Sequence, residues 1–184
     1  MRATIFLATL IGPVFAQNQP SKTIADSVVG PLRMVEGQLL GVAEAMPESK
    51  YSFIPTSGNF EGVRSFGEQI KHVACSQFAF FNEIERKTPP AECEKGGPSK
   101  ATTKAELIQY LRDSFDYGNR VLASTDQKNQ LDRVEGRYAG PNTRLGIGVI
   151  AVWHMTDHYG QLVEYLRMNG IVPPVTQQYG LKVR

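Results

Sequence analysis

Proline and glycine divide this chain into four long stretches in which apolar residues recur with helical spacing. The stretches cover approximately residues 26–46, 65–86, 103–122 and 142–168. Apolar residues at intervals of three and four lie on one face of a helix, and no stretch shows the alternation that is typical of a β-strand. Four helices of about 20 residues, each about 30 Å long, fit a bundle. We therefore predict an all-α fold, a four-helix bundle.

Local signals set the ends of these helices. Ser65–Glu68 and Thr103–Glu106 each match a capping box. In this motif the hydroxyl of the first residue accepts a hydrogen bond from the third backbone amide of the helix, and the glutamate side chain accepts one from the backbone amide of the first residue. The fourth helix should begin at Asn142 or Thr143. It should end at Asn169-Gly170, because glycine accepts the left-handed backbone found at helix ends.

The first sixteen residues have the composition of a secretory signal peptide. Arg2 precedes an apolar run of about 13 residues, and Ala16 supplies a small residue at its end. The run is shorter than the ~20 residues needed to span a bilayer, which argues against a membrane anchor. We therefore expect cleavage after Ala16, export to the periplasm or the medium, and a single domain over residues 17–184.

The charge balance excludes one class of partner. Lys and Arg together number 20 against 18 Asp and Glu. Binding to the phosphates of nucleic acid needs clustered positive charge, so we expect no nucleic-acid partner. No stretch after the signal is apolar enough to span a membrane, so no membrane association is expected once the signal is removed.

The chain has two cysteines, Cys75 and Cys93. In an oxidising compartment a disulfide between them can persist. It would close a loop of about 18 residues, worth roughly 3 kcal/mol in the chain-entropy model. Two buried free thiols, or Cys75 as a metal ligand, are the alternatives.

All three histidines fall in predicted helices: His72 in the second, His154 and His158 in the fourth. Four residues make about one turn, so His154 and His158 lie about 6 Å apart on one face and can reach a single cation. Facing helices of a bundle can add His72. Three imidazoles would leave coordination positions for water or substrate, as in catalytic sites. The alternative is a chance spacing of ordinary core histidines.

The surroundings support a metal site, although chance spacing stays open as the alternative, and they exclude two known motifs. The fourth helix is apolar from Leu145 to Trp153, which predicts burial, and buried histidines without a role are costly. A zincin needs glutamate after the first histidine, where this chain has Met155. A di-iron bundle needs paired Glu-x-x-His motifs, which the sequence lacks.

Three segments carry a family resemblance: YSFIPT (51–56), RSFGEQIKHVA (64–74) and WHMTDHYGQLVEYLRMNGIVPP (153–174). Together they resemble the DinB/YfiT-like superfamily of metalloenzymes, over essentially the whole mature chain. The resemblance implies a bundle of up-down-down-up topology and a divalent metal held by His72, His154 and His158. It also implies a reaction class, because members with known activities are thiol-dependent S-transferases and others have been proposed as metal-dependent hydrolases.

Several residues near the histidines are candidates for supporting roles. Gln161 shares their helix face and could position a metal-bound water or a ligand, or simply form a hydrogen bond between helices. Glu68 is explained by its capping box, and Asp157 should point away from the site. Trp153 and Tyr165 should be core aromatics.

The sequence thus predicts an exported DinB-like metal-binding protein, a metal-dependent enzyme of hydrolase or thiol S-transferase type acting on a small molecule. The alternative is a non-enzymatic bundle that binds a metal or another ligand. The expected cofactor is a divalent metal ion, zinc or nickel first and iron or manganese next. The sequence does not identify the metal, because imidazole suits zinc, nickel, copper and iron alike. Neither substrate nor oligomeric state follows from the sequence, and a homodimer is the assembly we keep open.

Overall fold

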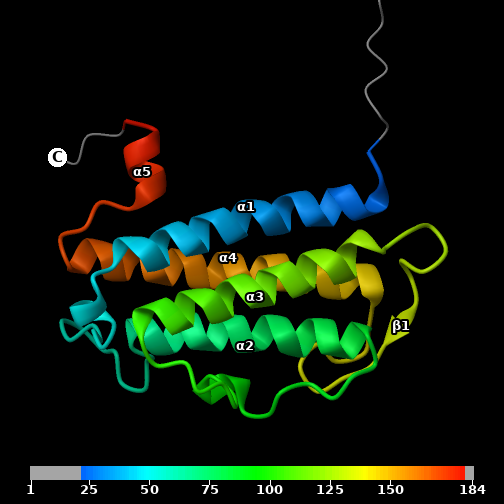
Figure 1. Ribbon diagram of the computed structural model, residues 1–184, viewed down its shortest axis with the longest axis horizontal. Helices are drawn as coiled ribbons and strands as arrows, with labels where there is room; N and C mark the ends of the chain where they lie inside the picture. The colour runs from blue at the N-terminus through cyan, green and yellow to red at the C-terminus, as the bar shows by residue number, and fades with distance from the viewer. Residues whose placement is uncertain (1–21, 181–184) are drawn as a thin grey trace, which may run out of the picture.

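The computed structural model describes residues 22–180, and its four long helices confirm the predicted all-α fold (Figure 1). The helices are α1 (Ile24–Ala45), α2 (Phe66–Ile84), α3 (Lys104–Ala123) and α4 (Arg144–Met168). Short helices η1 (Glu48–Lys50), η2 (Cys93–Lys95) and α5 (Pro174–Gln178) lie between or after them. The predicted signal peptide, residues 1–16, lies outside the described residues.

The predicted caps set the helix starts. Ser65 and Thr103 accept hydrogen bonds from the amides three residues on, and both capping boxes are complete. The side chain of Thr143 caps α4. The start of α1 differs from the expectation, because Thr23 and Asp26 form a third capping box and the helix begins two residues earlier, at Ile24.

Contacts between helix pairs define the directions of the bundle. α2 and α3 run parallel: a Cβ at Gly67 would lie 3.4 Å from Leu107 at their starts, and Tyr117 donates to Asn82 near their ends. The colour gradient of Figure 1 shows α1 and α4 running the opposite way. The order of directions along the chain is therefore up, down, down, up.

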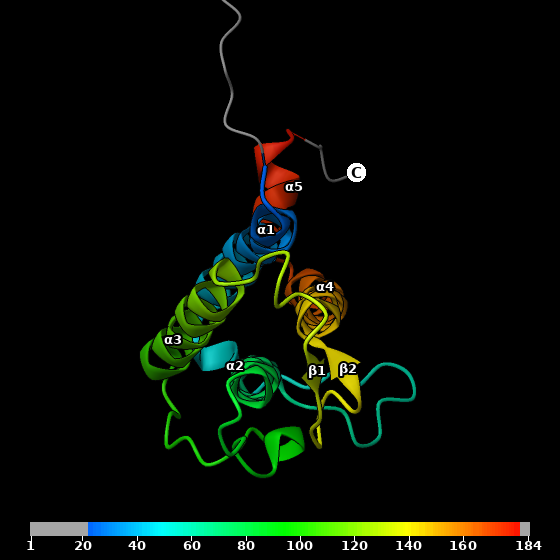
Figure 2. The ribbon, with the colours of Figure 1, turned by 90° about the vertical axis from the view of Figure 1, so that its right-hand side faces the viewer.

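Viewed end-on, α1 and α2 lie at opposite corners, with α3 and α4 between them (Figure 2). Because α2 and α3 are parallel neighbours, the chain must travel back along the bundle between them. The connection 85–103 does this and carries η2 alongside α2.

The core fills the centre of the four helices. Its fully buried side chains come from every helix: Leu32, Leu39, Phe66, Phe81, Leu111, Phe115, Ile147, Met155 and Leu162. Packing is close enough that a Cβ at Gly118 would lie 2.3 Å from the ring of Phe81. Helices α2 and α3 approach each other there because residue 118 has no side chain.

Two expectations need correction. Trp153 is 67% exposed and Val149 is 57% exposed, so the apolar start of α4 is not buried all round and Trp153 is not a core aromatic. Residues 147, 151 and 155 face the core, and helical periodicity turns 149 and 153 to the opposite side. Tyr165 is buried, as expected.

The second correction concerns strands. The connection between α3 and α4 contains a two-residue antiparallel pair, β1 (Arg133–Val134) with β2 (Asn142–Thr143), which the sequence pattern did not predict. Two residues are too few to show an alternation. Among residues 22–180, every helix falls short of the length and apolar character that a bilayer crossing requires.

Candidate metal centre

The side chains of His72, His154 and His158 meet between α2 and α4. Nε2 of His158 lies 3.1 Å from Nε2 of His72 and 3.1 Å from Nε2 of His154. One ligand nitrogen from each of the three lies within 4.8 Å of the other two. Within residues 22–180 this is the single group of three or more such side chains close enough to share a cation.

These distances fit the donor set of a transition-metal ion. Two imidazole nitrogens that each lie 2.0–2.1 Å from one ion are about 3 Å apart when the angle between the bonds is near 90–110°. The two 3.1 Å separations match that value. Imidazole nitrogen binds zinc, nickel, copper and iron, so the three histidines fit a divalent metal ion but do not identify which one.

Burial favours the neutral rings that metal binding requires. Burial lowers the pKa of His72 below its ordinary value, mainly through loss of solvation. Burial, followed by repulsion from the other two histidines, lowers the pKa of His154 to about 3. The pKa of His158 falls to about 4, again chiefly through burial. All three rings are therefore neutral near pH 7.

The connection after α2 holds His72 in one tautomer. Nδ1 of His72 lies 2.8 Å from the backbone oxygen of Cys93. A carbonyl can only accept, so Nδ1 carries the proton and donates it. In the neutral ring Nε2 then has a free lone pair, directed at the other two histidines. Such a carbonyl partner orients a metal-binding imidazole and raises its basicity.

A chain of amides lies behind His158. Nε2 of Gln69 is 2.6 Å from Nδ1 of His158 and donates to Oε1 of Gln161 at 2.5 Å. Gln161 in turn donates to Asp157. With Gln69 in this orientation the proton of His158 sits on Nε2. A ring that binds a cation through Nε2 needs an acceptor at Nδ1. Oε1 of Gln69 becomes that acceptor only if the amides of Gln69 and Gln161 both turn over, because turning Gln69 alone would place its oxygen against Oε1 of Gln161.

His154 is the most accessible of the three. His72 and His158 are buried, whereas His154 is half-buried. The ring of Phe80 packs edge-on against His154, with centroids 5.5 Å apart. Nδ1 of His154 has no hydrogen-bond partner among the described residues. The solvent-accessible part of the three-histidine group is therefore mainly the ring of His154.

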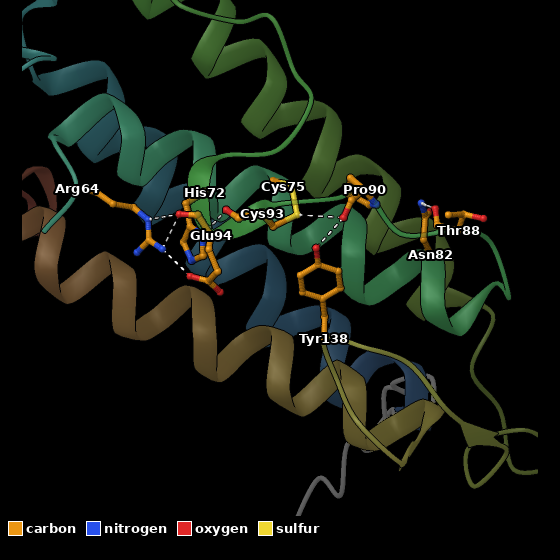
Figure 3. The surroundings of a disulfide bond; sticks show 9 residues. All are labelled: Arg64, His72, Cys75, Asn82, Thr88, Pro90, Cys93, Glu94 and Tyr138. Atoms are coloured by element: carbon orange, nitrogen blue, oxygen red, sulfur yellow. Dashed lines mark hydrogen bonds and ion pairs between the residues drawn. A yellow bond between two sulfur atoms is a disulfide. The ribbon is translucent and has the colours of Figure 1, made fainter. Parts of the chain in front are cut away.

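A disulfide borders the centre. Sγ of Cys75 is joined to Sγ of Cys93, with Cα atoms 5.3 Å apart (Figure 3). Cys75 lies one turn after His72 on α2, and Cys93 is the residue whose carbonyl receives the proton of His72. In the part of the chain that the structure describes, no cysteine is free to act as a further ligand.

The remaining candidates lie outside the cluster. Gln161 accepts a hydrogen bond from Gln69 and donates one to Asp157, so its amide links α2 to α4. Its side chain also reaches His158, where it raises the pKa against the larger effect of burial. Glu68 caps α2 through the Ser65 amide, which lowers the pKa of its carboxyl. Asp157 is exposed. Sequence reasoning missed Gln69, although a polar residue one turn before His72 on the same helix face was a usable signal.

The fold and the site define the class: an all-α bundle with a candidate tri-histidine metal centre between antiparallel helices. A sequence model described as the DinB superfamily matches residues 32–162, which is more than half of the chain. The chain belongs to the DinB superfamily, as the sequence resemblance predicted. A comparison with curated proteins finds no match.

Solved structures share the fold. One is a conserved protein from Enterococcus faecalis, 16% identical, with a TM-score of 0.64 over 80% of this chain and 97% of that one. Another is a DinB-like protein from Bacillus subtilis, 19% identical, with a TM-score of 0.61 over 78% of this chain and 92% of that one. At these identities the likeness establishes the fold alone.

Proposed function

We propose that this chain is an exported, metal-dependent enzyme of the DinB superfamily, of hydrolase or thiol S-transferase type, acting on a small molecule. His72, His154 and His158 hold a divalent cation, with zinc or nickel favoured and iron or manganese next. The single observation that carries the proposal is the convergence of three neutral imidazoles, with Nε2 separations of 3.1 Å.

The rest of the site supports a reactive centre more than a sealed structural one. Three protein nitrogens leave coordination positions open, which is typical of catalytic sites. A divalent cation held there would act as a Lewis acid and lower the pKa of a water or thiol that it binds. The chain's own residues bind the ion, orient two of the rings through Cys93 and Gln69, and limit solvent access through Phe80.

Metal content is the first test. Protein expressed with its own N-terminus and without a histidine tag is purified from the export compartment and analysed for transition metals. We expect about one ion per chain. Mass spectrometry of the same sample should give a mature chain that begins at Gln17. Metal-free protein that cannot be loaded with zinc, nickel, iron or manganese would overturn the proposal.

Activity separates the enzyme from the alternative, a bundle that binds a metal or ligand without catalysis. The loaded protein is assayed with ester and amide substrates, and with electrophiles in the presence of low-molecular-weight thiols. Turnover that disappears with chelator and returns with metal supports the enzyme. A loaded protein with no turnover in either assay favours the binding protein.

A further inference from the structure

The loop that contains η2 makes a direct contact with a metal-centre residue. Its Cys93 carbonyl accepts the Nδ1 proton of His72 at 2.8 Å. The connection between α2 and α3 has no regular structure other than η2, Cys93–Lys95. A loop of this kind holds a carbonyl in a fixed place only if something ties it to the helix.

The disulfide is the first tie. It joins the same residue, Cys93, to Cys75 on α2, three residues after His72. Both cysteines are buried, with exposed fractions of 0% and 1%. Gly97 closes over the bond, since a Cβ there would lie 2.3 Å from Sγ of Cys75. The cystine and the imidazole therefore hold the loop at neighbouring points on one helix face.

An ion pair is the second tie. Arg64 precedes α2, and its Nε and Nη2 donate to the backbone oxygen of Glu94 at 3.0 and 2.8 Å. Nη2 also contacts the Glu94 carboxylate at 2.6 Å. Figure 3 shows the guanidinium and the cystine on either side of the contact between Cys93 and His72. The exposed ion pair is weak compared with a covalent bond, so the disulfide is the stronger tie.

We propose that the Cys75–Cys93 disulfide is a positioning element of the metal centre, which keeps the Cys93 carbonyl on His72 and so holds that ring in the metal-binding tautomer. This inference rests on the proposed metal site. It gives the disulfide a role beyond global stability, because the cross-linked residue is itself the hydrogen-bond partner of the ligand.

The test compares two variants of the full chain. Cys75→Ser with Cys93→Ser removes the cross-link at nearly constant volume. Lys95→Ala is the control in the same loop, because the Lys95 side chain is exposed and pairs with Glu92. Zinc affinity is measured by competition with a chromophoric chelator. Loss of such an outer contact should weaken zinc binding by about 10- to 100-fold. The control should bind zinc like the parent protein, and an unchanged affinity in the double variant overturns the proposal.

A second readout distinguishes positioning from stability. Long-range nitrogen–proton NMR reports the tautomer of each histidine without needing a metal. His72 should carry its proton on Nδ1 in the parent protein and in Lys95→Ala, and should populate both tautomers in the double variant while circular dichroism remains helical. If the parent binds no zinc, the proposed function fails, but this tautomer comparison still decides the positioning role.

The parent protein alone gives a decisive result if the double variant does not fold. Thiol titration of denatured, unreduced parent protein should find no free thiol, and its His72 should be protonated at Nδ1. Two free thiols, or a proton on Nε2 of His72, would overturn the proposal.

Discussion

Nε2 of His72 lies 3.1 Å from Nε2 of His158, although 86 positions separate the two residues in the sequence. The contact joins α2 to α4 and is buried at both ends. His154 and His158 are one helical turn apart, a spacing that is common in helices. The contact with His72 adds a third imidazole nitrogen to this pair.

Removing one ring should release the metal. His158→Ala takes away the nitrogen that lies near both others, so metal content should fall well below one ion per chain while the helical circular dichroism remains. Thr156→Ala is the matched control on the same helix, because Thr156 is exposed and its hydroxyl donates to the backbone oxygen of Val152, one turn earlier. Elemental analysis measures the metal ions per chain in both variants. If His158→Ala binds as much metal as the parent protein, His158 is not a ligand.

The amide of Gln69 should matter for metal affinity. Gln69→Leu removes the amide that lies 2.6 Å from Nδ1 of His158, so zinc binding should weaken by about 10- to 100-fold. Gln69→Glu keeps an acceptor at that position and should bind zinc at least as tightly as the parent protein. Chelator competition measures both. Equal weakening by the two substitutions would show that the acceptor is not what matters.

The folded protein should lose stability below pH 6.5 when chelator keeps it free of metal. Burial lowers the pKa of His154 to about 3 and that of His158 to about 4, from 6.5. Between these values the unfolded chain binds more protons than the folded one, so the free energy of unfolding decreases as the pH falls. Each such proton contributes about 1.4 kcal/mol per pH unit. Urea unfolding between pH 7 and 5 measures the slope, which His154→Gln should reduce.

Replacing a glycine by alanine should change the stability of the fold in opposite directions at two positions, Gly118 on a packed helix face and Gly160 on an open one. A Cβ at Gly118 would meet the buried ring of Phe81 at 2.3 Å, so Gly118→Ala should destabilise the fold by about 1–3 kcal/mol. Gly160 has nothing within 4 Å, so Gly160→Ala should stabilise α4 by up to about 1 kcal/mol. Thermal unfolding compares them. A stabilising Gly118→Ala would show that α2 and α3 are less closely packed than described.

A buried amide provides a further test of the core. Gln77 has an exposed fraction of 0%, and within the described residues neither end of its amide has a hydrogen-bond partner. Gln77→Met replaces it with an apolar side chain of similar shape and should stabilise the fold by about 1–3 kcal/mol. Gln109→Met, on the exposed face of α3, should change stability little. A destabilising Gln77→Met would reveal a partner for the amide, such as buried water.

Local chemistry explains why the four long helices could be predicted. Capping boxes at Ser65 and Thr103 and the stop at Asn169-Gly170 act within a few residues, so their effect does not depend on the rest of the molecule. The spacing of His154 and His158 is equally local, because one helical turn brings them to one face. His72 was the one histidine left to complete the group from a facing helix, and the family resemblance implied the same three residues.

Tertiary packing decided what local pattern could not. Trp153 is apolar yet exposed, because the rotation of α4 against its neighbours determines which face is covered. The contacts of Cys93 with His72 and of Gln69 with His158 join separate segments, and their formation depends on the register of α2 against α4 and on the path of a loop. Sequence alone determined the helices and nominated the three rings. Only the packed bundle brought the rings and their orienting partners together, because that convergence depends on the relative placement of segments far apart in the chain.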